Sequence, residues 1–165
     1  MNIKNFKEML WFQFGAAIDM LENALKQCPE KVWGDRTRKP EFWYVAFHTL
    51  FWLDLYLSDG VKGFTPPAPY TLDELDPAGL LPERVYTKEE IQSYLEHGRN
   101  KCKKQIAALT DEKVNQRGGF KWIEGSVAEL HLYNLRHVQH HTGQLNLILR
   151  QTIDSAPRWV SRTKY

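Results

Sequence analysis

The chain has 165 residues, a length at which a single domain over residues 1–165 can enclose a complete hydrophobic core. Its 22 lysine and arginine residues nearly balance its 20 aspartate and glutamate residues, so the total charge gives no reason to expect nucleic acid or an anionic membrane as a partner. The two cysteines lack a Cys-x-x-Cys spacing, which indicates neither a thiolate zinc site nor a disulfide framework, and reduced thiols in a cytoplasmic protein fit best.

The first predicted element is an amphipathic helix from about Ile3 to Cys28, which Pro29 ends. One face of it carries the apolar residues Phe6, Leu10, Phe14, Ala17, Leu21 and Leu25. Basic residues ahead of an apolar stretch resemble a secretory signal, but Glu8 and Gln13 interrupt that stretch and the helical rhythm continues beyond it. No apolar run approaches the roughly 18 residues that a membrane span requires, so we expect no membrane partner.

The second predicted helix begins at Pro40, whose fixed φ suits a first helical turn, and ends at Ser58, Asp59 and Gly60. Its sequence, EFWYVAFHTLFWLDLYL, is aromatic nearly all round. A helix without a polar face should be buried on most sides. We therefore expect this helix at the centre of the domain or against a second subunit.

Residues 61–86 are predicted to form an extended, irregular crossing, because a long helix cannot accommodate their prolines at positions 66, 67, 69, 77 and 82. A single helical turn is predicted at Thr71, where the letters TLDE have the Thr-x-x-Glu pattern of a capping box. This long connection separates the second helix from the third.

Two further long helices are predicted, each opened by a capping box. The third runs from Thr87, in TKEE, to about Leu109, and the fourth runs from Ser126, in SVAE, to about Thr152. No strand-like alternation and no internal repeat competes with this interpretation. We therefore expect an all-α fold, a four-helix bundle with a long crossover connection between the second and third helices.

The fourth predicted helix carries three histidines in the stretch RHVQHHTGQLN. His137 and His141 are four residues apart, and successive helical residues turn by about 100° and rise by about 1.5 Å, so both rings emerge on one face. Two imidazoles at this spacing can converge on one metal ion. His140 points away from the pair and is left outside the ligand set, although a pairing of His137 with His140 is an open alternative.

The same face continues as a polar stripe along a helix that is otherwise rich in apolar residues. Asn134 lies three residues before His137, and Gln144 lies three residues after His141. Burying such a stripe is costly unless its groups have partners. A metal ion whose ligands are themselves hydrogen-bonded would provide those partners.

His48 is the best candidate for the third ligand that a durable site needs. It lies in the middle of the second predicted helix, where it can face the bundle interior, whereas Asp54 lies nearly opposite on the helical wheel. Taken alone, His48 is more often a core histidine bonded to a neighbour. Three mid-helix histidines together favour a metal site. His97 and His131 carry no pattern and are expected to be solvated or locally bonded.

Two known classes of metal site are disfavoured by the neighbours of these histidines. Val138 follows His137, where the H-E-x-x-H motif of the zincin proteases requires a glutamate. A di-iron bundle needs Glu-x-x-His pairs from two helices, and neither His48 nor His137 has a glutamate three residues before it.

With AFHTLFWLDLY in the second helix and LRHVQHHTGQLN in the fourth, the chain resembles the DinB-like, or YfiT-like, family of metalloenzymes. The resemblance implies a bundle in which His48, His137 and His141 bind one divalent metal ion, commonly zinc or nickel. Related members are thiol-dependent transferases or isomerases that use a low-molecular-weight thiol, or metal-dependent hydrolases, and homodimers are common among them. The family name records induction by DNA damage, and the sequence gives no basic groove that would indicate DNA binding.

The expected function is therefore a metal-dependent enzyme that acts on a small electrophilic substrate, by thiol transfer or by hydrolysis. Gln144 and Glu124 are candidates to orient a metal-bound water, and Arg136 is a candidate to hold an anionic substrate group or to lie on the solvent face. Apolar walls of the substrate site are expected from Tyr44, Trp52 and Trp122. The competing hypothesis is a non-catalytic bundle that binds a metal or small ligand, or a dimeric interaction module.

Overall fold

The structure is a computed structural model of the chain and describes residues 2–164. The long helices are α1 (Ile3–Gln27), α3 (Phe42–Tyr56), α4 (Lys88–Ala107) and α6 (Val127–Ile153). Short helices lie in the connections: α2 (Glu30–Trp33), η1 (Asp73–Leu75) and α5 (Asp111–Asn115). Residues 2–164 contain no β-strand, only an isolated bridge between Arg117 and Ser126. The predicted all-α class is confirmed.

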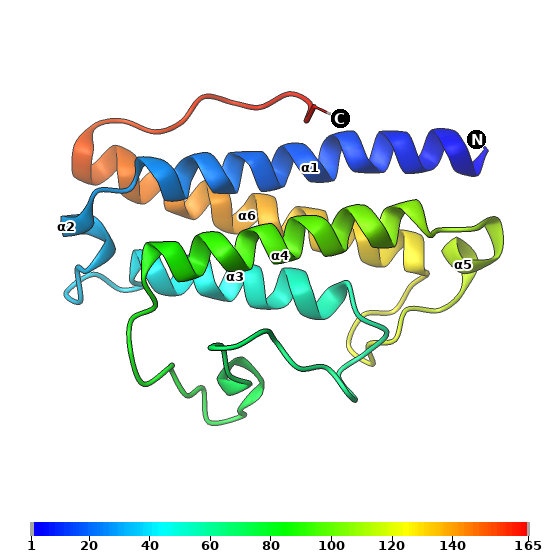
Figure 1. The fold of residues 1–165 in the computed structure, drawn as a ribbon, viewed down its shortest axis with the longest axis horizontal. Helices are drawn as coiled ribbons and strands as arrows, with labels where there is room; N and C mark the ends of the chain where they lie inside the picture. Colours follow the sequence, from blue (N-terminus) through cyan, green and yellow to red (C-terminus); the bar gives the residue numbers. More distant parts are fainter. Residues whose placement is uncertain (1, 165) are drawn as a thin grey trace.

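Each long helix packs against two others around a common core (Figure 1). α3 lies against α4 and α6, and α1 lies against the same two helices. In Figure 1, α1 and α6 run in one direction and α3 and α4 in the other. Because α3 and α4 are parallel neighbours, the chain must return along about one helix length, roughly 30 Å, between them. Residues 57–87 make that return, and the predicted four-helix bundle with a long crossover is confirmed.

The capping signals located the starts of α4 and α6, whereas the predicted start of α3 was wrong. Thr87 and Ser126 each form the predicted capping box with the glutamate three residues later. α3 begins at Phe42, so Pro40 precedes the helix instead of occupying its first turn. The intervening Glu41 is extended, and its buried carboxylate accepts a hydrogen bond from Nε1 of Trp43 at 2.7 Å. This contact holds the chain extended for one more residue.

The turn predicted near Thr71 is present as η1, but its capping box is not formed. The Thr71 hydroxyl donates to Oδ2 of Asp73 at 2.5 Å. Glu74, the predicted partner of Thr71, instead directs its carboxylate at α3, where Nδ1 of His48 and Nε1 of Trp52 donate to its Oε2. A local sequence pattern was overridden by a long-range contact.

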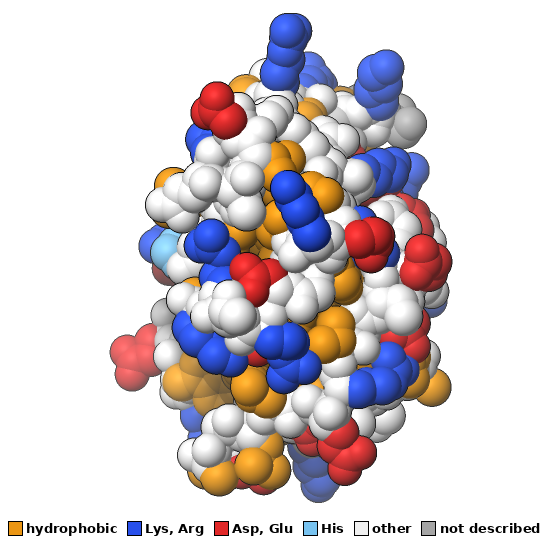
Figure 2. Space-filling view, turned by 90° about the vertical axis from the view of Figure 1, so that its left-hand side faces the viewer, with side chains coloured by type: hydrophobic (Ala, Val, Ile, Leu, Met, Phe, Trp, Pro, Cys, Tyr) orange, Lys and Arg blue, Asp and Glu red, His pale blue; other side chains and the backbone are white. Residues whose placement is uncertain are grey.

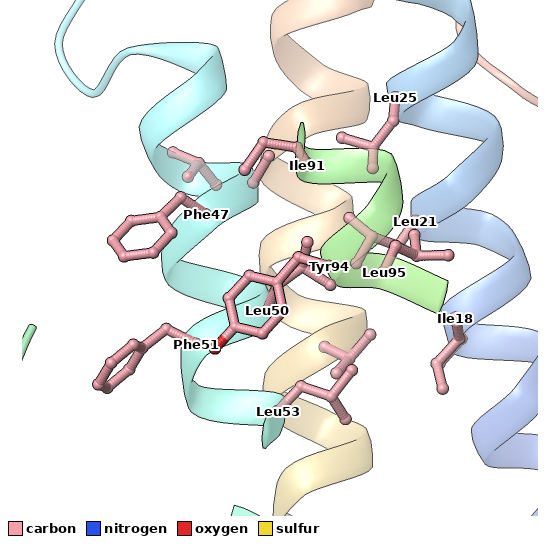
Figure 3. Close-up of a cluster of buried hydrophobic side chains, with 14 of the residues drawn as sticks. Ile18, Leu21, Leu25, Phe47, Leu50, Phe51, Leu53, Ile91, Tyr94 and Leu95 are labelled. Atoms are coloured by element: carbon pink, nitrogen blue, oxygen red, sulfur yellow. The ribbon is translucent and has the colours of Figure 1, made fainter. Parts of the chain in front are cut away.

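The core fills the space between the four long helices (Figure 3). α3 is buried on most sides, as its aromatic composition predicted. Labelled members of the core are Ile18, Leu21 and Leu25 of α1, Phe47, Leu50, Phe51 and Leu53 of α3, and Ile91, Tyr94 and Leu95 of α4. Fully burying one such side chain contributes about 1.5–3 kcal/mol to folding, so this cluster holds the helices that carry the candidate site.

The last described residues run back along α1 (Figure 1). The amide of Thr163 donates to the carbonyl of Phe12 at 3.1 Å, and its hydroxyl donates to Oδ2 of Asp19 at 2.5 Å. Gly15 permits this approach, since a Cβ at that position would lie 2.4 Å from Cγ2 of Thr163. A mid-helix glycine costs about 0.5–1 kcal/mol relative to alanine, and docking of the tail offsets that cost.

The surface at the end of the bundle that carries α2 is mixed in character. Figure 2 shows basic and acidic side chains interspersed with apolar ones on this face, without an extended area of one charge. In the part of the chain that the structure describes, no helix combines the length and the apolar character that crossing a membrane demands.

Candidate metal centre

The fold brings His48 of α3 and His137 and His141 of α6 into one cluster. Each ring offers one nitrogen, and these three nitrogens lie within 4.8 Å of one another. Nε2 of His48 and Nε2 of His137 are 3.5 Å apart. The rings of His48 and His141 have their centroids 4.7 Å apart, and those of His137 and His141 are 4.4 Å apart. Within residues 2–164 no other group of His, Cys, Asp or Glu side chains has such a spacing.

The packing of α3 against α6 positions the cluster. His137 and His141 share one face of α6 because they are one helical turn apart. Asn134, one turn earlier on that face, is fully buried, and its Nδ2 donates to the carbonyl of Leu53 at 3.1 Å. This bond joins α6 to α3 next to the cluster, in a register in which His48 faces the histidine pair.

Two acceptors orient the rings of the cluster. Nδ1 of His48 donates to Oε2 of Glu74 at 2.6 Å, and Nδ1 of His141 donates to Oε1 of Gln144 at 2.7 Å. A neutral imidazole with its proton on Nδ1 has a free lone pair on Nε2. These two rings therefore present an acceptor nitrogen. Nδ1 of His137 is buried and has no hydrogen-bond partner among the described residues.

Burial keeps the α6 pair neutral. Desolvation, together with the neighbouring His141, His48 and His140, lowers the pKa of His137 to about 3. Desolvation also lowers the pKa of His141, against the hydrogen bond to Gln144 that raises it. Metal ions bind the neutral imidazole, so at pH 7 these two rings have no proton to displace.

The donor set and its spacing fit a divalent metal ion. Nitrogen–zinc bonds of about 2.0–2.1 Å in a tetrahedral site put two nitrogens about 3.4 Å apart. The 3.5 Å between Nε2 of His48 and Nε2 of His137 is close to this value. The three histidines could hold one metal ion.

Glu74 is the site residue that the sequence interpretation missed. Its side chain is 4% exposed, and Oε2 also accepts a hydrogen bond from Nε1 of Trp52 at 2.9 Å. Burial would raise the pKa of this carboxyl, but the hydrogen bonds from His48, Tyr44 and Trp52 outweigh burial and lower the pKa. Glu74 lies 26 residues from His48 in an irregular segment, so no periodicity indicates the contact.

The other candidate residues occupy different positions. Gln144 accepts the hydrogen bond from Nδ1 of His141 and so orients that ring. His140 is exposed and lies outside the three-nitrogen cluster, as expected. Glu124 is exposed beside Arg117 and, among the described residues, forms no hydrogen bond or ion pair with the histidines. Arg136 is exposed and, with His137 and His140, lines a hollow of about 440 Å³.

Aromatic rings surround the cluster on the α3 side. The centroids of Tyr44 and Trp52 are each 6.2 Å from that of His48. Trp122 lies 6.4 Å from Trp52 and is 53% exposed, and its Nε1 donates to the hydroxyl of Tyr56 at 3.4 Å. Tyr44 and Trp52 thus flank a histidine that is itself 27% exposed, so solvent and small molecules can reach the site.

The expectation for His131 was wrong, whereas that for His97 is confirmed. His97 is exposed, and its Nε2 also donates to Oδ1 of the buried Asp54 of α3 at 3.3 Å. His131 is only 5% exposed, and its Nδ1 has no partner among the described residues. It lies near the start of α6 beside a cavity of about 570 Å³ at the end of the bundle. Packing of α5 and α6, which the sequence pattern did not reveal, buries it.

Acidification is expected to destabilise the protein through His131. Burial lowers its pKa to about 4, whereas in the unfolded chain it has the ordinary value near 6.5. Between these two pKa values His131 is protonated in the unfolded state and neutral in the folded state. The free energy of unfolding therefore falls as the pH falls from 6.5 to 4. The expected loss is roughly 3 kcal/mol.

Urea unfolding of the wild type and of His131→Phe, at intervals from pH 7.5 to pH 4, measures this effect. The difference in the free energy of unfolding between the two proteins should shift in favour of the variant as the pH falls. A constant difference across this range would contradict the assignment. Because both proteins keep the other histidines, their contribution cancels in the comparison.

Comparison with known proteins gives a match to a protein family. A family model described as the DinB superfamily matches residues 13–145, which include the three clustered histidines. No curated protein and no solved structure gives a significant match.

Proposed function

The chain belongs to the DinB superfamily, and from this premise we propose that it is a metal-dependent enzyme acting on a small electrophilic substrate. The observation that carries the proposal is the convergence of His48, His137 and His141 between α3 and α6. The neutral state of the two α6 rings and the spacing between Nε2 of His48 and Nε2 of His137 support it.

In this proposal the three histidines hold one divalent ion, zinc or nickel. When bound, the ion lowers the pKa of a thiol or water that reaches it, which makes that group nucleophilic near neutral pH. Gln144 keeps the ring of His141 in place, and Glu74 does the same for His48. Tyr44 and Trp52 supply apolar surface beside His48 for a small substrate.

The proposed nucleophile comes from solution, as a low-molecular-weight thiol or as water. The chain's own thiols, Cys28 and Cys102, are both buried. Burial raises the pKa of both, that of Cys28 to about 12, so neither thiol ionises near neutral pH. In thiol transfer the co-substrate would lose its S–H proton to solvent and its sulfur would form a bond to the electrophilic carbon, while the leaving group departs with the electron pair of the bond that it loses. In hydrolysis water would lose a proton in the same way, its oxygen would form the new bond to carbon, and the same leaving group would depart.

Turnover of a panel of small electrophiles, with and without low-molecular-weight thiols, tests the proposal. We expect activity that is lost when a chelator removes the metal and restored by one equivalent of zinc or nickel per chain, because only the ion activates the nucleophile. Saturable stimulation by one thiol would identify transfer, and equal activity with water alone would identify hydrolysis.

The matched control is the chelated protein after dialysis, whose helix content by circular dichroism should equal that of the untreated protein. A chain that binds one metal ion yet turns over no electrophile would favour the non-catalytic metal-binding bundle. A folded chain that takes up no ion would contradict the proposal.

A further inference from the structure

A carboxylate from the crossover is buried against the candidate metal centre. Glu74 lies in η1, within the irregular segment between α3 and α4, and its side chain is 4% exposed. A buried carboxylate is costly unless donors satisfy it. Two α3 side chains, those of His48 and Trp52, donate to Oε2 at 2.6 and 2.9 Å.

The bond to His48 determines which of its nitrogens faces the cluster. With Nδ1 donating to the carboxylate, Nε2 is the nitrogen left to approach Nε2 of His137, at 3.5 Å. A carboxylate behind a metal-binding histidine fixes the ring's tautomer and orientation and makes it a more basic ligand. Nε1 of Trp52 also donates to Oε2 of Glu74, so a second hydrogen bond restrains the carboxylate if the ring of His48 moves.

We propose that Glu74 is a positioning residue for the metal centre, and that metal binding therefore fastens η1 of the crossover to α3. The inference rests on the proposed metal binding by His48. An ion bound at Nε2 withdraws electron density from the imidazole and makes the N–H at Nδ1 a stronger donor. Metal binding at Nε2 therefore strengthens the hydrogen bond from Nδ1 to Glu74.

A purely structural role predicts a different outcome. If Glu74 only anchors the crossover, its loss would destabilise the chain without weakening metal binding, and bound metal would leave the exchange of the η1 amides unchanged. Metal affinity and site-resolved hydrogen exchange therefore separate the two roles.

Competitive titration of zinc against a chromophoric chelator at pH 7.5 measures the affinity of the wild type, Glu74→Gln and Glu83→Gln. Glutamine keeps an acceptor oxygen but removes the charge. We expect roughly 10- to 100-fold weaker binding for Glu74→Gln. Glu83→Gln is the matched control, because Glu83 is an exposed glutamate of the same crossover, and it should bind zinc as the wild type does.

Equal affinity of the wild type and Glu74→Gln would overturn the inference while leaving the proposed function standing. A wild type that binds no metal ion would overturn both. Should Glu74→Gln fail to fold, hydrogen exchange of the wild type decides. Zinc is expected to slow the exchange of a peptide that covers residues 71–76, and unchanged exchange there would overturn the inference.

Discussion

Replacing His137 and His141 together by alanine is expected to reduce the metal content from about one ion per chain to near zero. The change removes two of three candidate ligands, and His48 alone cannot hold an ion against competing water and buffer. The measurement is elemental analysis by mass spectrometry of tag-free protein after dialysis. The variant should stay folded, since the histidines that it lacks are neutral and the core beneath them is unchanged.

The control variant is His140→Ala, which changes a histidine of the same helix that is exposed and outside the cluster. It should retain the ion. Metal loss in His140→Ala, or retention in the double variant, would mean that other residues bind it. The alternative pairing of His137 with His140 predicts that the control fails in this way, so one experiment distinguishes the two ligand sets.

Replacing Asp54 by alanine is expected to lower the free energy of unfolding by about 3 kcal/mol. Asp54 is 1% exposed and lies between α3 and α4, where Nζ of Lys101 donates to Oδ1 at 2.5 Å and the hydroxyl of Tyr94 donates to Oδ2 at 3.2 Å. Alanine leaves the Lys101 charge without its counter-ion. Lys101 is 24% exposed, so water solvates part of its unpaired charge. The expected loss of stability is therefore at the lower end of the roughly 3–5 kcal/mol that follows when one partner of a buried ion pair is removed.

Urea unfolding monitored by circular dichroism measures this effect as a shift of the midpoint at constant slope. Asp59→Ala is the matched control, because Asp59 pairs with Lys113 at 3.4 Å but is 99% exposed, and such pairs contribute little. The double change Asp54→Leu with Lys101→Met should recover most of the loss, since it removes both charges. An Asp54→Ala midpoint equal to that of Asp59→Ala would contradict the prediction.

Asp54 and His48 also show how one helix serves two purposes. The sequence placed them nearly opposite each other on the second helix, and the structure turns Asp54 toward α4 and His48 toward α6. The ionic contact with Lys101 and the Asn134 bond to the Leu53 carbonyl both limit rotation of α3. Loss of either contact is therefore expected to change the spacing of His48 from His137 and His141.

The helices and the histidine pair were determined by the sequence alone. Apolar periodicity and capping patterns act over three to four residues, so the chain positions of α4 and α6 could be derived from them. Helical periodicity, which also relates residues three to four positions apart, placed His137 and His141 on one face. The burial of α3 could also be predicted from its own sequence, because a helix with aromatic residues on every side has no polar face to expose to solvent.

The tertiary structure alone decided which distant groups complete the site. His48 reaches the pair only because α3 packs antiparallel to α6 in one register, and Glu74 reaches His48 only because the crossover folds back onto α3. The burial of His131 has the same origin in the packing of the bundle end. Local sequence patterns specify helices through interactions between residues that are close in the chain. The contacts of His48, Glu74 and His131 depend instead on how separate helices pack around one core, and no short stretch of sequence determines that packing.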